Sequence, residues 1–325
     1  MRRSPVLDAG PPARYSGAMK IGIVGSGAMG SLFGGRLSLT GCDVVLYDIF
    51  REHVEAVTAD GLSIEDAATG AVTTARPRAS TDPRSVEGSD LLVIFVKSTA
   101  TEEAAVQFAP RAGRNAIVLT LQNGLGNEAI LSRVFGPERT AAGVTSQGAT
   151  FLGPGRIRHA GKGPTHICMS SGRNEKLAPV CAAFEAAGFE THVSADVESL
   201  VWSKLVINVG INALTAITSQ PNGGLLDSEE TKAIMADLVG EAVAVAKARG
   251  IPLTHEDPLA VVYDVARKTG ANRSSMLQDF DRNRASEIEV MNGAIVREAA
   301  RAGIAAPVNT TITRLIRAIE KARGR

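Results

Sequence analysis

Three polar residues recur at a spacing of four within an otherwise apolar segment, and their side chains could do chemistry. They are Lys204, Asn208 and Asn212, in the segment 197–219, which has helical periodicity. Four residues advance an α-helix about 40° beyond one full turn, so the three form one gently winding stripe. The stripe either faces solvent or lines a polar pocket. In a pocket, a partly desolvated lysine with a lowered pKa can donate a proton, and the amides can orient a substrate.

A glycine-rich turn near the N-terminus has the pattern of a phosphate-binding loop. It follows an apolar segment, precedes a helical one and consists of Gly25, Ser26, Gly27, Ala28, Met29 and Gly30. The first glycine permits a tight turn, the second lets the backbone approach a pyrophosphate, and the third lets the helix pack closely. The helix N-terminus adds free N–H groups. The sequence therefore predicts a dinucleotide site here.

An acidic residue ends the second apolar segment, DVVLYD, at the spacing where a carboxylate meets the adenosine ribose. This residue is Asp48. A carboxylate there accepts hydrogen bonds from both ribose hydroxyls and repels a 2′-phosphate, which favours NAD(H) over NADP(H). Arg51 would weaken that preference if it turned toward the ribose, and Asp48 could alternatively be a solvated residue at a strand end.

A third cluster of polar residues lies further along the chain. Asn272, Ser274 and Ser275 offer donors suited to a carboxylate, at a loop or a helix start. Glu287 is near the start of a helical segment, 285–302. A glutamate in that position is ordinarily a surface residue that complements the helix dipole, and periodicity alone favours this interpretation.

The elements that must position these residues follow two patterns. Short apolar segments alternate with helical ones in the first part of the chain, which predicts a parallel sheet with crossover helices. We expect strands at 20–24, 43–47, 91–96 and 117–121, β-rich stretches at 61–78 and 143–170, and a helix at 175–187. Only helical periodicity follows, at 197–219, 228–249, 256–268, 285–302 and 307–323.

These patterns predict an α/β fold with an N-terminal Rossmann-type dinucleotide-binding domain and an all-helical C-terminal domain. We expect a disordered tail at 1–18, the first domain at 19–190, and a helical domain for substrate binding and dimerisation at 191–325. The tail has no apolar run of the kind found in secretory signals. These features predict a cytoplasmic protein.

Composition excludes several classes of partner. The formal net charge of +1 and an aromatic content of 4% argue against nucleic acid and anionic membrane surfaces. No stretch approaches the roughly 20 uninterrupted apolar residues of a membrane helix. Cys42, Cys168 and Cys181 lack metal-ligand spacing, so we expect buried, reduced cysteines and no metal site.

Taken together, the motifs resemble the ketopantoate reductase family (2-dehydropantoate 2-reductases and relatives) from Met19 to about Lys321. The matching pieces, in order, are GSGAMG, VIFVKS with Lys97, LQNGLGNE with Asn123, WSKLVINVGINALTAIT, QPNGGLL, SSMLQD and SEIEVMNG. The tract SSMLQD followed by EI-x-x-x-NG is especially specific, because this combination rarely arises by chance.

The resemblance implies a role for each matched residue. Lys204 would be the general acid that protonates the C2 ketone of a 2-keto acid while NAD(P)H delivers hydride. Glu287 would hold the hydroxyl end of the substrate, against the surface interpretation. Ser275 would bind the substrate carboxylate, with Asn208 and Asn212 on the hydroxyl side.

The remaining carried-over residues concern the cofactor and the edge of the site. Asn123 would hold substrate and cofactor at the domain cleft, and Lys97 would touch the cofactor ribose or help to orient that cleft. Glu241 matches a family acidic residue that would contact substrate. Family members that use NADPH usually carry an arginine just past the second strand, where this chain has Ile49. This departure again favours NAD(H).

We therefore expect reduction of a branched 2-keto acid, 2-dehydropantoate, to its D-2-hydroxy acid, pantoate, by a homodimer. An NAD-dependent D-2-hydroxyacid dehydrogenase of the D-mandelate type is the alternative enzyme. A non-catalytic dinucleotide-binding sensor or scaffold is the alternative of another class, and the presence of Lys204, Ser275 and Glu287 argues against it.

Overall fold

The computed structural model of the chain describes residues 19–324, which form two compact units. Unit 1 contains the described residues up to Val96, together with Thr101–Leu121 and Ile130–Ala195. Unit 2 contains Lys97–Ala100, Gln122–Ala129 and the chain from Asp196 onward. The tail expected at 1–18 lies outside the described residues.

Unit 1 is built on an eight-stranded sheet with the order β12-β11-β8-β7-β6-β1-β2-β5. Neighbouring strands are parallel except for the antiparallel pair β8 and β11. The strands are β1 (Lys20–Val24), β2 (Asp43–Tyr47), β5 (Arg78–Ser80), β6 (Leu91–Ile94), β7 (Ile117–Thr120), β8 (Thr140–Thr145), β11 (Thr165–Met169) and β12 (Thr191–Val193).

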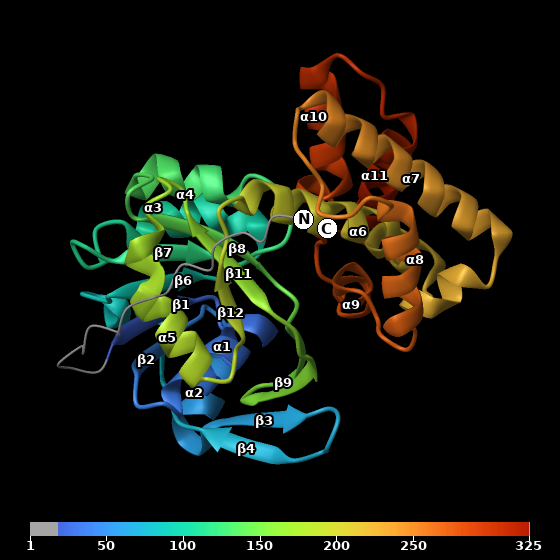
Figure 1. The fold of residues 1–325 in the computed structure, drawn as a ribbon. Helices are drawn as coiled ribbons and strands as arrows, with labels where there is room; N and C mark the ends of the chain where they lie inside the picture. Colours follow the sequence, from blue (N-terminus) through green and yellow to red (C-terminus); the bar gives the residue numbers. More distant parts are fainter. Residues whose placement is uncertain (1–18, 325) are drawn as a thin grey trace, which may run out of the picture. The chain divides into compact units, whose positions relative to one another are not determined.

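Helices cover both faces of this sheet, which explains why its central strands β1, β2, β6 and β7 are mostly apolar and buried (Figure 1). The helices of this unit are α1 (Ala28–Ser38), α2 (Arg51–Asp60), α3 (Thr101–Phe108), α5 (Ala178–Ala186) and α4 (Asn127–Phe135), of which the first three residues belong to unit 2. Within β1, Ile21 and Ile23 pack in the core with α1 and α5, whereas Val24 packs in the core with α3 and α4. This arrangement confirms the Rossmann-type prediction for the first domain.

A second, four-stranded sheet has the order β4-β3-β10-β9. Its strands are β3 (Leu62–Asp66), β4 (Val72–Ala75), β9 (Gly148–Gly153) and β10 (Arg156–Gly161). Both β-rich stretches expected from the sequence contribute strands to this sheet. Their pairing, β10 parallel to β3, joins segments far apart in the chain and has no local sequence signal.

Unit 2 is helical throughout its described part and is organised around one long apolar helix. Its helices are α6 (Val197–Thr218), α7 (Glu229–Ala248), α8 (Pro258–Lys268), α9 (Ser275–Asp281), α10 (Asn292–Ala302) and α11 (Pro307–Ala322). Asp196, Ser228, Asp257 and Ser274 cap the first four of these with side-chain oxygens. The helix α6 supplies residues from Trp202 to Ala216 to the core of the unit.

Among the residues described, α6 is also the one helix long and apolar enough to cross a membrane. However, 67% of its most apolar window is buried inside the protein. A core helix of a folded domain passes the same test of length and composition. The polar stripe expected on it therefore lies on a helix that is mostly buried.

The structure corrects three expectations about the elements. The boundary expected at 190 lies before β12, which pairs with β11, so unit 1 continues to Ala195. The helix α9 was expected only as a possible helix start, since seven residues are too few to show periodicity. The helix expected at 285–302 begins at Asn292, after a 3-10 turn at Ile288–Val290.

Candidate functional site

Two of the three glycines in the turn after β1 are required by the packing of the fold, and the third is not. Gly25 has φ +95°, and a Cβ on it would lie 2.6 Å from the backbone nitrogen of Val96. A Cβ on Gly30 would collide with the carbonyl oxygen of Gly25. The fold itself therefore requires Gly25 and Gly30. Gly27 has φ −60°, and a Cβ on it would meet no atom of the described residues within 4 Å.

The open space at Gly27 lies at the N-terminus of α1 and fits a dinucleotide pyrophosphate. Gly27 is the N-cap of α1, and within the described chain no side chain caps this end and no acid occupies its first turn. The first helical residues, Ala28 and Met29, therefore present N–H groups that have no partner within the helix. The turn also follows β1, the strand that lies between β2 and β6, where dinucleotides bind in doubly wound sheets.

Asp48 lies beside this turn and is held by backbone donors. Its Oδ2 accepts from the Ser26 N–H at 2.6 Å and the Ser26 hydroxyl at 3.3 Å, and its Oδ1 accepts from the Phe50 N–H at 2.9 Å. The next side chain, Ile49, is 84% exposed. The carboxylate thus has a fixed orientation at the edge of the glycine turn, and an apolar side chain stands next to it.

A chain of buried hydrogen bonds, which the sequence did not reveal, stabilises the glycine-rich turn. The Gly155 N–H donates to His53 Nδ1 at 3.0 Å, so His53 carries its proton on Nε2 and donates to the Ser31 hydroxyl at 3.1 Å. Ser31 then donates to the Ser26 carbonyl at 2.7 Å. Burial lowers the pKa of His53, against the opposing charge of Asp48, which keeps the ring neutral in this role. A buried histidine and serine look like ordinary core residues in sequence, so no signal marked them.

The polar stripe of α6 is partly buried, and none of its three residues is fully exposed. Asn212 is buried, while Lys204 and Asn208 are half-buried. Burial lowers the pKa of Lys204 to about 8, and the negative charge of Glu287 opposes this shift. Partial burial and the lowered pKa of Lys204 are what a polar pocket would require, and the pocket itself stays a prediction.

The start of α9 faces this stripe. The Asn212 amide donates to the Ser275 hydroxyl at 3.3 Å, which brings together two of the residues expected to bind substrate. Ser274 caps α9 by accepting from the Leu277 N–H at 3.1 Å, so its role is structural. Asn272 is exposed.

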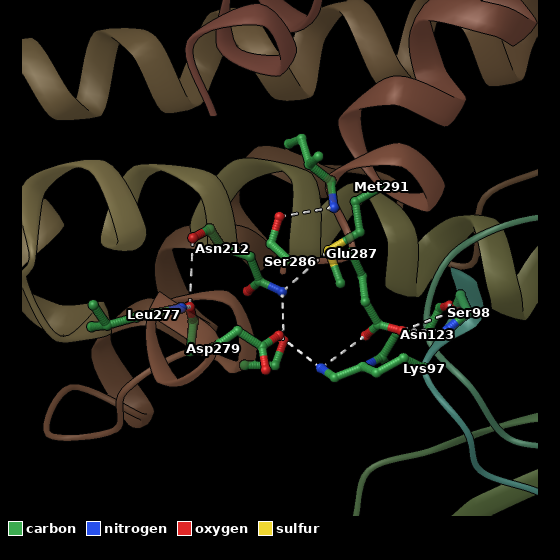
Figure 2. Close-up of polar contacts among 12 residues, drawn as sticks. Lys97, Ser98, Asn123, Asn212, Leu277, Asp279, Ser286, Glu287 and Met291 are labelled. Atoms are coloured by element: carbon green, nitrogen blue, oxygen red, sulfur yellow. Dashed lines mark hydrogen bonds and ion pairs between the residues drawn. The ribbon is translucent and has the colours of Figure 1, made fainter. Parts of the chain in front are cut away.

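Glu287 is buried, so the interpretation as a surface residue is wrong. Its side chain is 9% exposed, and Figure 2 shows its carboxylate between Ser98 and Lys97. The Ser98 N–H and hydroxyl both donate to Oε1 at 2.9 Å, and Lys97 Nζ lies 3.8 Å from Oε2. Glu287 directly precedes the 3-10 turn Ile288–Val290 and lies outside the helix α10, and its carboxylate is stabilised by donors from Lys97–Ala100.

Asp279 completes this cluster, although the sequence analysis did not single it out. It is 5% exposed and accepts from Lys97 Nζ at 2.7 Å. Burial raises the pKa of Asp279, while the charge and hydrogen bond of Lys97 oppose the shift. The only sequence signal was its place in the SSMLQD tract. Two lysines and two carboxylates, counting Lys204 and Glu287, therefore act on one another in unit 2.

Two residues expected near the cofactor have contacts within unit 2. Lys97 is joined to Asp279, and its expected contact with a cofactor ribose stays a prediction. The carbonyl of Asn123 accepts from Ser98 at 3.3 Å and from the Asn127 amide at 3.1 Å. The expected contacts of the Asn123 side chain also stay a prediction.

Glu241 has a different role from the one expected. Both of its carboxylate oxygens accept hydrogen bonds at the start of α11, from the N–H groups of Val308 at 2.7 Å and Asn309 at 2.8 Å and from the Asn309 amide at 2.8 Å. An acidic group is favourable at a helix N-terminus. Glu241 is a capping residue, so we withdraw its assignment to substrate.

The cysteines are free thiols, but only one of them is buried. Cys168 is buried, whereas Cys42 and Cys181 are half-buried, contrary to the expectation for all three. Partial burial raises the pKa of Cys181 to about 11. Within residues 19–324, no group of three or more histidine, cysteine, aspartate or glutamate side chains could hold a metal ion.

Two family models match the chain. The model described as "Ketopantoate reductase PanE/ApbA" matches residues 21–172, and its C-terminal counterpart matches residues 196–320. A 2-dehydropantoate 2-reductase from Halobacterium salinarum is 38% identical over 304 residues, which cover 93% of this chain and 99% of the relative.

Solved structures agree with this match. A PanE/ApbA family ketopantoate reductase from Ralstonia eutropha has a TM-score of 0.87 at 37% identity, covering 94% of this chain and 100% of that one. A D-mandelate dehydrogenase in a ternary structure with NADH and anilino(oxo)acetate also has a TM-score of 0.87, at 28% identity and the same coverage.

The different roles of the glycines can be tested by adding one carbon atom. We expect Gly27→Ala to leave the melting temperature unchanged, because its Cβ enters open space at an ordinary φ. The same Cβ should weaken NADH binding by tenfold or more, about 1.4 kcal/mol, by obstructing the pyrophosphate. Fluorescence titration with NADH measures this. Gly30→Ala is the control and should lower the melting temperature. Unchanged NADH affinity in Gly27→Ala would contradict the assignment.

The capping role of Glu241 predicts a loss of stability. Glu241→Gln replaces one acceptor oxygen by a donor that faces N–H groups, so we expect the free energy of unfolding to fall by about 1–3 kcal/mol. Urea denaturation measures this. Glu229→Gln, on the same helix but with a side chain that is 87% exposed, should change stability little. A stable Glu241→Gln protein with weakened keto-acid binding would restore the substrate role.

Proposed function

The chain belongs to the ketopantoate reductase family, and from this premise we propose that it reduces 2-dehydropantoate to pantoate with a nicotinamide cofactor. The observation that carries the proposal is the partly buried polar stripe of α6, on which Lys204 has a pKa of about 8 and interacts electrostatically with Glu287. Such an amino group can both hold and release a proton in the neutral range. The names of relatives such as the Halobacterium salinarum reductase support the same activity.

Lys204 is the general acid in this proposal. A bound nicotinamide cofactor supplies the hydride that reaches the C2 carbon, and the oxygen of the ketone then needs a proton. The Lys204 ammonium donates that proton to the oxygen, because burial has weakened its hold on the proton. In the reverse direction the neutral amine accepts the proton from the hydroxyl group.

The other residues of unit 2 bind and orient the substrate. Glu287 holds the hydroxyl end, and Ser275 at the start of α9 donates to the substrate carboxylate. Asn208 and Asn212 contact the hydroxyl side, and Asn123 contributes a further hydrogen bond. The Asn212–Ser275 contact and the burial of Glu287 support this assignment. Lys97 and Asp279 contribute opposite charges beside Glu287.

We assign NAD(H) as the preferred cofactor, bound by the turn from Gly25 to Gly30. The Asp48 carboxylate, fixed by Ser26 and Phe50, accepts from the ribose hydroxyls and repels a 2′-phosphate. Ile49 offers no positive charge to such a phosphate. Arg51 is the first residue of α2 and the nearest cation in sequence.

A D-2-hydroxyacid dehydrogenase of the D-mandelate type is the second candidate. It is favoured by the similarity to the D-mandelate dehydrogenase solved with NADH, which has a TM-score of 0.87. A sensor without catalysis is disfavoured because Lys204 and Glu287 are both present and electrostatically coupled. We also propose a cytoplasmic location and a homodimer formed through the helical unit, both of which rest on the sequence.

Removing the general acid gives the first test of mechanism. We expect Lys204→Ala to lower kcat by about 10²-fold or more. In the wild type, kcat for reduction should fall as the pH rises above about 8, because the ammonium form is lost, and the rate of oxidation should rise over the same range. Steady-state pH profiles in both directions measure this. Near-normal turnover in Lys204→Ala would remove this residue from the mechanism.

Substrate and cofactor choice can be tested in one panel. We expect the highest kcat/KM for 2-dehydropantoate with NADH among aliphatic and aromatic 2-keto acids assayed with each cofactor. Ile49→Arg should shift preference toward NADPH, since a guanidinium pairs well with phosphate. A higher kcat/KM on aromatic keto acids would favour the second candidate. A wild-type preference for NADPH would contradict the role of Asp48, and absence of turnover would favour a sensor.

A further inference from the structure

We propose that Ser98 is a positioning residue that holds the Glu287 carboxylate in the orientation needed to bind substrate, and that Asn127 orients the Ser98 hydroxyl for this purpose. The inference rests on the proposed role of Glu287. Ser98 follows Lys97 at the start of a short 3-10 helix, Ser98–Ala100.

The contacts that carry the inference all converge on one oxygen. The Ser98 N–H and the Ser98 hydroxyl each lie 2.9 Å from Glu287 Oε1. Two donors on one oxygen restrict rotation of a planar carboxylate, so the direction of Oε2 is determined as well. Lys97 Nζ lies 3.8 Å from Oε2, which places the positive charge on the other side of the same group (Figure 2).

Asn127 determines where the Ser98 hydroxyl points. Its amide donates to Ser98 Oγ at 3.2 Å, which occupies one lone pair of that oxygen. The hydroxyl hydrogen must therefore turn toward an acceptor, and two lie within reach. Glu287 Oε1 is at 2.9 Å and the Asn123 carbonyl is at 3.3 Å. The shorter, charge-assisted bond to the carboxylate is the stronger one.

Burial makes these donors important for Glu287. Glu287 is 8% exposed, Ser98 is 6% exposed and Asn127 is 4% exposed. A carboxylate with so little contact with water depends on protein donors to remain in one orientation. Removing the Ser98 hydroxyl leaves one backbone donor on Oε1, so the carboxylate gains rotational freedom at the place where it meets substrate.

A double-mutant cycle tests whether Ser98 acts through Glu287. We expect Ser98→Ala to lower kcat/KM for 2-dehydropantoate roughly tenfold, the lower end for one charge-assisted hydrogen bond, with the KM for NADH unchanged. In the Glu287→Gln background, Ser98→Ala should cause a clearly smaller further loss, because the negative charge that Ser98 positions is gone. Ser98→Thr, which retains the hydroxyl, should keep most of the activity.

A binding measurement covers the case in which Glu287→Gln has no measurable turnover. The same cycle is then followed through the affinity for pantoate in the presence of NADH, a complex that cannot react. Thermal unfolding checks each variant, and Ser98→Cys, of similar size but a weak donor, should replace Ser98→Ala if that variant is unstable. Thr313→Val, which removes a buried hydroxyl that donates to the Asn309 carbonyl, is the matched control and should leave activity unchanged.

The outcomes separate this inference from the proposed function. Full additivity of Ser98→Ala and Glu287→Gln, or wild-type activity in Ser98→Ala, would overturn the positioning role while leaving the function intact. Wild-type activity and pantoate affinity in Glu287→Gln alone would overturn the proposed role of Glu287 first, and this inference with it.

Discussion

The structure of unit 2 depends on one requirement, which is that its buried charged side chains must have partners within the protein. Lys204, Asp279 and Glu287 are withdrawn from water to different extents, and each therefore needs partners of opposite charge or hydrogen-bond donors. The helices of unit 2 do not supply all of these partners. The short segments Lys97–Ala100 and Gln122–Ala129 belong to this unit and bring Lys97, Ser98 and Asn127 to the carboxylates.

The same constraint decides what each carboxylate can do. Glu241 and Glu287 are the same residue type, but the first has both oxygens occupied by donors at the start of α11. A carboxylate so occupied stabilises a helix and is poorly placed to bind a ligand. Glu287 instead has donors concentrated on Oε1 and a lysine charge beside Oε2, an arrangement that fixes the group without enclosing it in a helix cap.

Periodicity in the sequence predicted the strands and most helices because those signals are local. β1 and β2 begin and end where expected, and α6 carries the stripe of Lys204, Asn208 and Asn212. The contacts of Glu287 and Asp279 could not be predicted in this way, since Lys97 is 182 residues from Asp279 and Ser98 is 189 residues from Glu287. Local position alone suggested a surface residue for Glu287, and only the resemblance to a family placed it in a site.

The pKa of Lys204 depends on two opposing effects, and one of them comes from a neighbouring residue. Burial lowers its pKa to about 8, while the charge of Glu287 opposes the shift. Any group that fixes the Glu287 carboxylate therefore also fixes the field at the Lys204 amine. Lys97 and Ser98 both contact the Glu287 carboxylate, and through it they affect the proton affinity of Lys204. The proton transfer proposed for Lys204 therefore depends on a fixed orientation of the Glu287 carboxylate as well as on the lysine itself.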